Sequence, residues 1–110
     1  MLVTLQDILA EGEKRSCAVA AFNVYNLETA MGVANAAKET QAPVIFQVYS
    51  RLFDKLNARY LAPGLLQIIR DLREPAAFHL DHGAGPEQMM RAINCGATGI
   101  MIDASTLPLE

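Results

Sequence analysis

The chain has 110 residues, a formal net charge of −3 and 52% hydrophobic residues. This length and composition suffice for one domain with a buried core, and a charged fraction of only 19% excludes an intrinsically disordered chain. Acidic and basic residues are scattered, and only 6% of the residues are aromatic. The sequence therefore has neither the basic face nor the stacking surface of a nucleic-acid-binding protein.

The N-terminal segment, TLQDILAEGEKR, predicts a short helix rather than a signal peptide. Thr4 can cap this helix and Asp7 stands three positions later, as in a capping box. The segment lacks a basic start, and Asp7 and Glu11 interrupt its apolar run. No apolar run approaches the roughly 20 residues of a membrane span, so no membrane partner is expected.

The two cysteines indicate a reducing compartment. Cys17 and Cys95 lie far apart, and neither belongs to a C-x-x-C pair. We therefore expect a cytoplasmic protein in which both thiols are buried as small apolar groups.

Four continuous apolar runs predict strands that are buried on both faces, as in a parallel sheet. These runs are residues 17–24, 42–48, 75–80 and 98–103. Helical spacing occurs between them. Asn26 can cap a helix from residue 27 to about 38, in which Met31, Ala34 and Ala37 share a face.

Two further helices are predicted in the second half of the chain. One covers residues 64–73, and the proline just before it must stop, kink or start a helix. The other begins at Pro86, has Glu87 near its positive end, and ends before Gly96. The predicted order is α–β–α–β–α–β–α–β within a single domain, residues 1–110.

Repeated βα units predict parallel strands joined by right-handed crossovers. Two architectures are compatible with them, a small doubly wound sheet or part of a (β/α)₈ TIM barrel. A complete barrel needs roughly 250 residues, and this chain stops just after a strand, at IDASTLPLE. The fold class expected is therefore α/β, with four strands that form about half of an apparently truncated barrel.

The segment PAAFHLDHGAG, residues 75–85, contains both histidines of the chain. His79 and Asp81 face the same side of the predicted strand, and His82 lies where that strand ends. Asp103 closes the next strand, so its carboxylate should lie on the same rim, where α/β proteins bind ligands. Imidazole and carboxylate groups suit zinc or a similar divalent ion. The alternative is a hydrogen-bonded structural pair, since catalytic zinc takes three protein ligands and this spacing offers two at most.

Two other features of the rim have two interpretations each. Gly83–Gly85 can form a phosphate-binding turn before a helix, or can simply permit a tight turn. Asn23, at the end of the first strand, can contact a substrate or cap the following helix.

The blocks AVAAFNVYNLET, APVIFQV, FHLDHG and IMIDASTLP resemble the N-terminal half of the class II, zinc-dependent ketose-bisphosphate aldolases. The resemblance runs over nearly the whole chain, with the blocks in the correct order. It implies a TIM barrel and the reversible cleavage of a fructose or tagatose 1,6-bisphosphate to dihydroxyacetone phosphate and glyceraldehyde 3-phosphate.

The resemblance also implies roles for individual residues. Asp81 matches the catalytic aspartate, which donates a proton to the aldehyde oxygen in the condensation direction. His82 matches the first Zn²⁺ ligand, and Asp103 matches a carboxylate that can hold a second divalent metal. Asn23 and Ser50 are the expected substrate contacts, although Tyr49 stands where the family commonly has a serine and Thr106 departs from the family's SHLP motif.

The family uses two further zinc-binding histidines and glycine-rich phosphate loops from later strands. We therefore expect an incomplete zinc site and no turnover by the isolated chain. A second hypothesis is a non-catalytic half-barrel that forms a homo-oligomer or pairs with a complementary half, because an open sheet exposes two edges. A third is a small metal- or phosphate-binding α/β protein of another kind.

Overall fold

The computed structural model describes residues 1–109. Helices and strands alternate along the chain, as predicted, with one additional short helix. In chain order the elements are α1 (Leu5–Lys14), β1 (Ala20–Asn23), α2 (Leu27–Thr40), β2 (Val44–Tyr49), α3 (Arg51–Asp54), α4 (Asn57–Arg70), β3 (Ala76–Gly83), α5 (Pro86–Asn94) and β4 (Gly99–Ile102).

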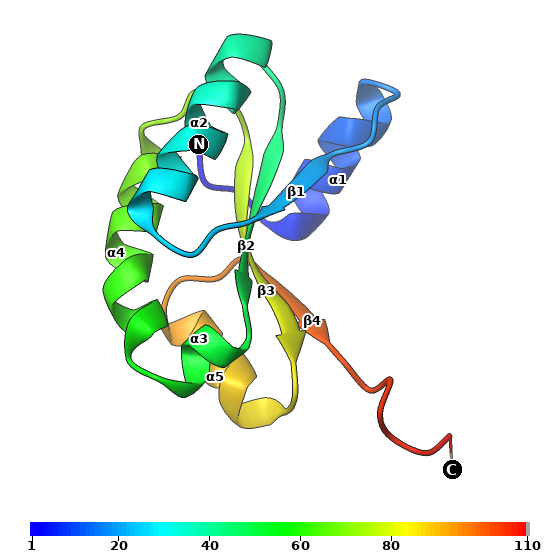
Figure 1. Ribbon diagram of the computed structural model, residues 1–110. Coiled ribbons are helices and arrows are strands. Elements are labelled where there is room, and N and C mark those ends of the chain that lie inside the picture. The colour runs from blue at the N-terminus through cyan, green and yellow to red at the C-terminus, as the bar shows by residue number, and fades with distance from the viewer. Residues whose placement is uncertain (110) are drawn as a thin grey trace.

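The four strands form one sheet in the order β1-β2-β3-β4, and all three strand pairs are parallel. Figure 1 shows α2, α3, α4 and α5 on one face of this sheet and α1 alone on the other. A doubly wound sheet reverses its strand order at a switch point and carries crossover helices on both faces. Consecutive strands with every crossover helix on the same face are typical of a segment of a (β/α)₈ barrel.

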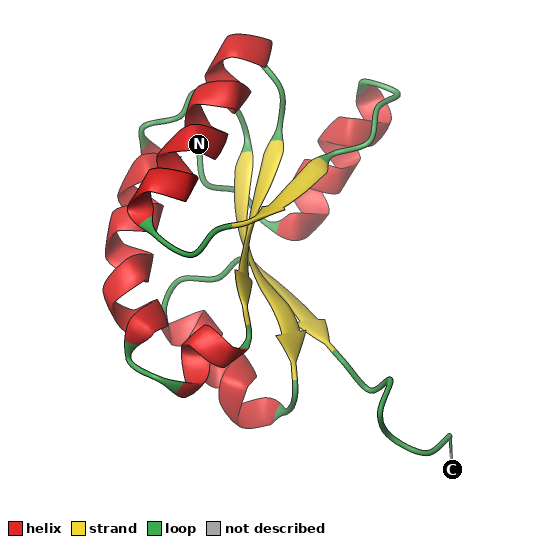
Figure 2. Ribbon diagram, viewed as in Figure 1, coloured by secondary structure: helices red, strands yellow, loops and turns green. Residues whose placement is uncertain are grey.

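Alternate residues of the strands enter two separate cores. The larger core lies between the sheet and the helices α2, α4 and α5, and it contains the fully buried rings of Phe46 and Phe78. The smaller core lies on the opposite face, where Ile8 of α1 packs on Ile45 and Ala77. Figure 2 shows this division, with helices on both sides of the yellow sheet.

Local sequence signals position the first two helices. The side-chain oxygen of Thr4 accepts a hydrogen bond from the Asp7 amide at 3.1 Å, and both halves of the predicted capping box are present. Asn26 caps α2 in the same way. Of the three residues predicted to share a face of α2, Ala34 and Ala37 are buried, whereas Met31 is 54% exposed. The buried stripe begins one residue before Met31, at Ala30.

Helix α4 differs most from its prediction. It begins at Asn57 rather than at residue 64, and Pro63 lies inside it. An interior proline costs roughly 3 kcal/mol, yet the helix continues because an apolar stripe on both sides of the proline packs on the sheet. The buried residues of that stripe are Ala58, Ala62, Leu65 and Ile69. The sequence also gave no indication of α3.

The prediction that both thiols are buried is wrong for Cys17, which is exposed, whereas Cys95 is partly buried. β1 begins only at Ala20, so Cys17 lies in the connection before it rather than in a strand. Both cysteines are free thiols. Between residues 1 and 109, no helix combines the length and the apolar character needed to cross a membrane.

Candidate active site

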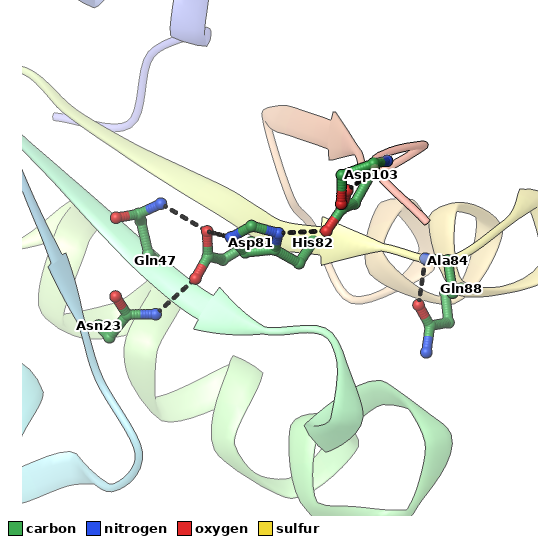
Figure 3. A network of polar contacts seen from close by, with 8 residues as sticks. Asn23, Gln47, Asp81, His82, Ala84, Gln88 and Asp103 are labelled. Carbon is green, nitrogen blue, oxygen red and sulfur yellow. Dashed lines mark hydrogen bonds and ion pairs between the residues drawn. The ribbon is translucent and has the colours of Figure 1, made fainter. Parts of the chain in front are cut away.

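The polar residues that end the strands gather along one edge of the sheet (Figure 3). Asn23 is the last residue of β1, and Gln47 lies near the end of β2. Asp81 and His82 lie near the end of β3, and Asp103 directly follows β4. All five residues therefore lie at the carboxyl ends of parallel strands, the edge where barrels of this kind bind their ligands.

Asp81 is held by two side-chain amides from the neighbouring strands. The Asn23 amide donates to Oδ2 of Asp81 at 2.9 Å, and the Gln47 amide donates to Oδ1 at 3.1 Å. The register explains the contacts, because Asn23 pairs with Gln47, and Gln47 lies two residues before the partner of Asp81. These bonds fix the orientation of a carboxylate whose side chain is only 15% exposed.

Two of these contacts were not foreseen. Asn23 does not cap α2, since Asn26 does, and it binds Asp81 instead. Gln47 escaped notice altogether, although a single polar residue within the apolar run VIFQV was a signal that could have revealed it. A lone amide in a buried strand needs a partner, and here that partner is the carboxylate.

An irregularity in β3 brings Asp81 and His82 to the same rim. Leu80 pairs with Ile100 and Gly83 pairs with Ile102, so β3 uses one residue more than β4 over this interval. His82 has a φ of 103°, which residues with a Cβ rarely adopt. In a regular strand neighbouring side chains point to opposite faces, but this β-bulge re-aims His82, and its Nε2 lies 3.4 Å from Oδ1 of Asp81.

His82 and Asp103 form a hydrogen-bonded pair across the ends of β3 and β4. Nδ1 of His82 lies 2.8 Å from Oδ2 of Asp103, and the Ser105 amide donates to Oδ1 of Asp103 at 2.9 Å. The bond to Asp103 raises the pKa of His82 above its ordinary value of 6.5. Hydrogen bonds from Ser105 and from His82 lower the pKa of Asp103 from 3.8 to about 2. Asp103 is thus a carboxylate at neutral pH, and it orients the imidazole.

A cleft of about 560 Å³ opens beside this pair. Tyr49, Ser50 and Thr106 line it together with His82 and Asp103. The Tyr49 ring stands edge-on to His82, with ring centroids 6.5 Å apart. Ser50 is only 5% exposed, and its backbone N–H donates to the Asp81 carbonyl at 2.9 Å. Both residues expected to contact substrate, Asn23 and Ser50, thus adjoin Asp81.

His79 does not join this network. It shares a face with Asp81, as predicted, but it is 8% exposed and lies close to Gly99 of β4, as Leu5 of α1 does. Its Nδ1 has no hydrogen-bond partner among residues 1–109. Burial lowers the pKa of His79, so the neutral ring is favoured. Of the two imidazoles expected in the cluster, only that of His82 therefore lies in the network at the strand ends.

Of the two glycines after His82, Gly83 serves packing, and neither glycine has a left-handed backbone conformation. A β-carbon on Gly83 would lie 2.9 Å from the Met101 carbonyl, so only glycine permits this approach to β4. Gly85 is extended, with φ of 174°, and has open space around it. The Gln88 side chain accepts a hydrogen bond from the Ala84 amide at 2.8 Å. A phosphate contact at this turn stays a prediction.

Within residues 1–109, no three or more His, Cys, Asp or Glu side chains are arranged so as to hold a metal ion. The candidate site contributes one imidazole from His82, whose side chain is 42% exposed.

Comparison with solved structures supports the assignment of the fold as a segment of a TIM barrel. The crystal structure of the YdjI aldolase from Escherichia coli K12 superimposes with a TM-score of 0.89 at 28% identity, over 98% of this chain and 41% of that one. A putative fructose-1,6-bisphosphate aldolase from Coccidioides immitis superimposes with a TM-score of 0.83 at 25% identity, over 94% and 41% of the two chains. The fold is thus part of an aldolase TIM barrel.

The family follows from sequence. The family profile described as fructose-bisphosphate aldolase class-II matches residues 3–110, so the chain belongs to that family. The 6-phospho-5-dehydro-2-deoxy-D-gluconate aldolase of Halalkalibacterium halodurans is 37% identical over 112 residues. A fructose-bisphosphate aldolase of Staphylococcus aureus is 34% identical over 112 residues. Each alignment covers 99% of this chain and 39% of the relative, so the chain spans about two fifths of their length.

Proposed function

We propose that the chain carries the catalytic aspartate and the first zinc ligand of a class II aldolase site. The reaction is the zinc-dependent, reversible cleavage of a ketose 1,6-bisphosphate to dihydroxyacetone phosphate and glyceraldehyde 3-phosphate. The observation that carries the proposal is the β-bulge that brings Asp81 and His82 together at the carboxyl ends of the strands, in a chain of this family. The site works in the cytoplasm, in keeping with two free thiols.

Asp81 is the proton-transfer group. In the cleavage direction its carboxylate accepts the proton of the hydroxyl whose oxygen becomes the aldehyde, while the carbon–carbon bond breaks and its electron pair stays with the ketone fragment. In condensation the same proton returns to the aldehyde oxygen. The amides of Asn23 and Gln47 hold the carboxylate in one orientation, which keeps it aligned with that oxygen.

His82 suits a zinc ion as one of several ligands. Because Nδ1 is bound to Asp103, Nε2 is the nitrogen left for a metal, and a carboxylate behind a ligating histidine is a common arrangement. A zinc ion there would supply Lewis-acid stabilisation of charge on the substrate carbonyl. Both Asp103 oxygens already accept hydrogen bonds, which favours an orienting role, and its binding of a second metal stays a prediction.

The isolated chain is expected to show no turnover with zinc and either fructose or tagatose 1,6-bisphosphate, since catalytic zinc takes three protein ligands. Turnover that Asp81→Ala abolishes would overturn that expectation while supporting the role of Asp81.

The role of Asp81 is tested in a chimera, in which residues 1–110 replace the matching segment of the Halalkalibacterium relative. Aldol cleavage is expected, and Asp81→Asn should lower kcat by about 10²–10⁴-fold, the usual contribution of a positioned acid–base group. Asp71→Asn removes an exposed carboxylate at the end of α4 and serves as the matched control. An Asp81→Asn chimera as active as the parent would contradict the proposal.

A second candidate function is a half-barrel that associates with itself or with a complementary half. Within residues 1–109, β1 and β4 each pair on one side only, and Phe22 and Ile102 on these strands are 47% and 62% exposed. Open strand edges and exposed apolar side chains favour association. Light scattering after size exclusion tests self-association, and a monomer at all concentrations would exclude it.

A further inference from the structure

A second cavity lies on the helical side of the molecule, where α3, α4 and α5 meet. Its volume is about 470 Å³, within the range of small-molecule sites. It shares only Asp54 with the cleft beside His82, so α3 separates the two. No residue of this cavity takes part in the proposed proton transfer at Asp81 or in the proposed zinc binding at His82.

Positive charge dominates the rim of this cavity. Lys55 lies in the loop before α4 and Arg59 in the first turn of α4. Neither forms a side-chain hydrogen bond or ion pair with any residue from 1 to 109. Arg91 of α5 is already occupied, because it donates to the Phe53 carbonyl at 3.1 Å and to Glu87 at 2.5 Å. It also lies 3.9 Å from Asp54, the carboxylate that lines the cavity. Two cations without partners therefore face the same volume.

The first turn of α4 adds to this positive potential. Leu56 precedes the helix and provides no side-chain cap, and the first turn contains no acidic residue. The first N–H groups of α4 lack the side-chain partner that Asn26 supplies to α2. They form the positive end of a helix of 14 residues. Backbone and side chains favour a ligand with two negative charges at this end.

The floor of the cavity is apolar. Phe53 and Ala58 are almost fully buried beneath it, and the side chain of Leu56 stands 57% exposed beside it. A free inorganic anion would leave this surface in contact with water, whereas a ligand with a small apolar body would cover it. The site therefore suits a ligand that is anionic at one end and apolar at the other.

We propose that the cavity between α3, α4 and α5 binds a phosphate monoester that carries a small apolar group. The phosphate lies against Arg59, Lys55 and the first turn of α4, because a dianion matches two cations and free N–H groups. The apolar group lies over Phe53 and Leu56. This site is independent of the chemistry proposed at Asp81.

The test is a titration of the labelled chain with phenyl phosphate, followed by amide NMR signals. Signals of residues 53–59 should move, and the double variant Lys55→Ala/Arg59→Ala should bind at least tenfold more weakly. Arg73→Ala, which removes an exposed arginine outside the cavity, is the matched control and should bind as the parent does. Phenol and inorganic phosphate should each bind more weakly than phenyl phosphate.

Two results would overturn the proposal. One is unchanged affinity in the double variant while its spectrum confirms the parent fold. The other is a set of moving signals centred on His82 and Asp103 instead of α4, which would assign the phosphate to the strand-end cleft. A third result, binding of inorganic phosphate as tight as that of phenyl phosphate, would show that the apolar floor contributes nothing to binding and would refute that part of the proposal.

Discussion

Replacement of His82 by glycine should leave the protein more stable than replacement by alanine. His82 has a φ of 103°, a left-handed conformation that strains every residue with a β-carbon. Both variants lose the imidazole and its hydrogen bond to Asp103, so they differ from each other only in that β-carbon. Their difference in stability therefore measures the strain at the bulge.

The expected difference follows from two opposing terms. A sparsely populated backbone conformation costs about 1–3 kcal/mol, while glycine loses roughly 0.4–1 kcal/mol more conformational entropy on folding. The glycine variant should thus be more stable by about 1 kcal/mol. For a chain of this size, this corresponds to a rise in Tm of roughly 4 °C.

Urea unfolding followed by circular dichroism measures both free energies of unfolding. The same pair of substitutions at Asn35, an exposed residue inside α2, is the control and should give the opposite order, with alanine more stable by up to about 1 kcal/mol. An alanine variant at position 82 that is more stable than the glycine variant by as much as at Asn35 would refute the strained bulge. The explanation of how Asp81 and His82 reach one rim would then be wrong.

Four further outcomes are expected. Asn26→Ala should lower the free energy of unfolding by about 1 kcal/mol, because Asn26 caps α2, and an equal loss in Asn35→Ala would contradict that. Gly99→Ala should destabilise by about 1–3 kcal/mol, since its β-carbon would lie 2.7 Å from Nδ1 of His79. Gly32→Ala, in open space on α2, should stabilise by up to about 1 kcal/mol. In an NMR titration His79 should have its midpoint below 6.5 and His82 above 6.5, and the reverse order would refute both environments.

The two histidines affect stability with opposite signs. The folded pKa of His79 is lowered, so its contribution is present above pH 6.5 and is lost as the pH falls through its folded pKa. The folded pKa of His82 is raised, so its contribution is present below pH 6.5 and is lost as the pH rises through its folded pKa.

Features set by neighbouring residues could be predicted from the sequence. The Thr4–Asp7 box and the Asn26 cap operate within one turn of helix, and both are present. The continuous apolar runs indicated strands buried on both faces, and three of the four strands lie within or close to the predicted ranges. The order of the strands at the rim followed from the parallel βα arrangement.

Features set by contacts between distant segments could not be predicted. The bulge at His82 arises from pairing with β4, about twenty residues later, and no local signal marks it. Pro63 is tolerated because the stripe beneath it packs on the sheet. The hydrogen bond from Gln47 to Asp81 spans β2 and β3. In each case tertiary packing overrides the local preference of the sequence.

The most direct measurement is a zinc titration of the labelled chain, followed by the imidazole NMR signals of its two histidines. The assignment of His82 as the zinc ligand predicts that the signals of His82 shift, that those of the enclosed His79 do not, and that His82→Ala loses the binding. Zinc binding of unchanged affinity in His82→Ala, or shifts confined to His79, would contradict the proposed site.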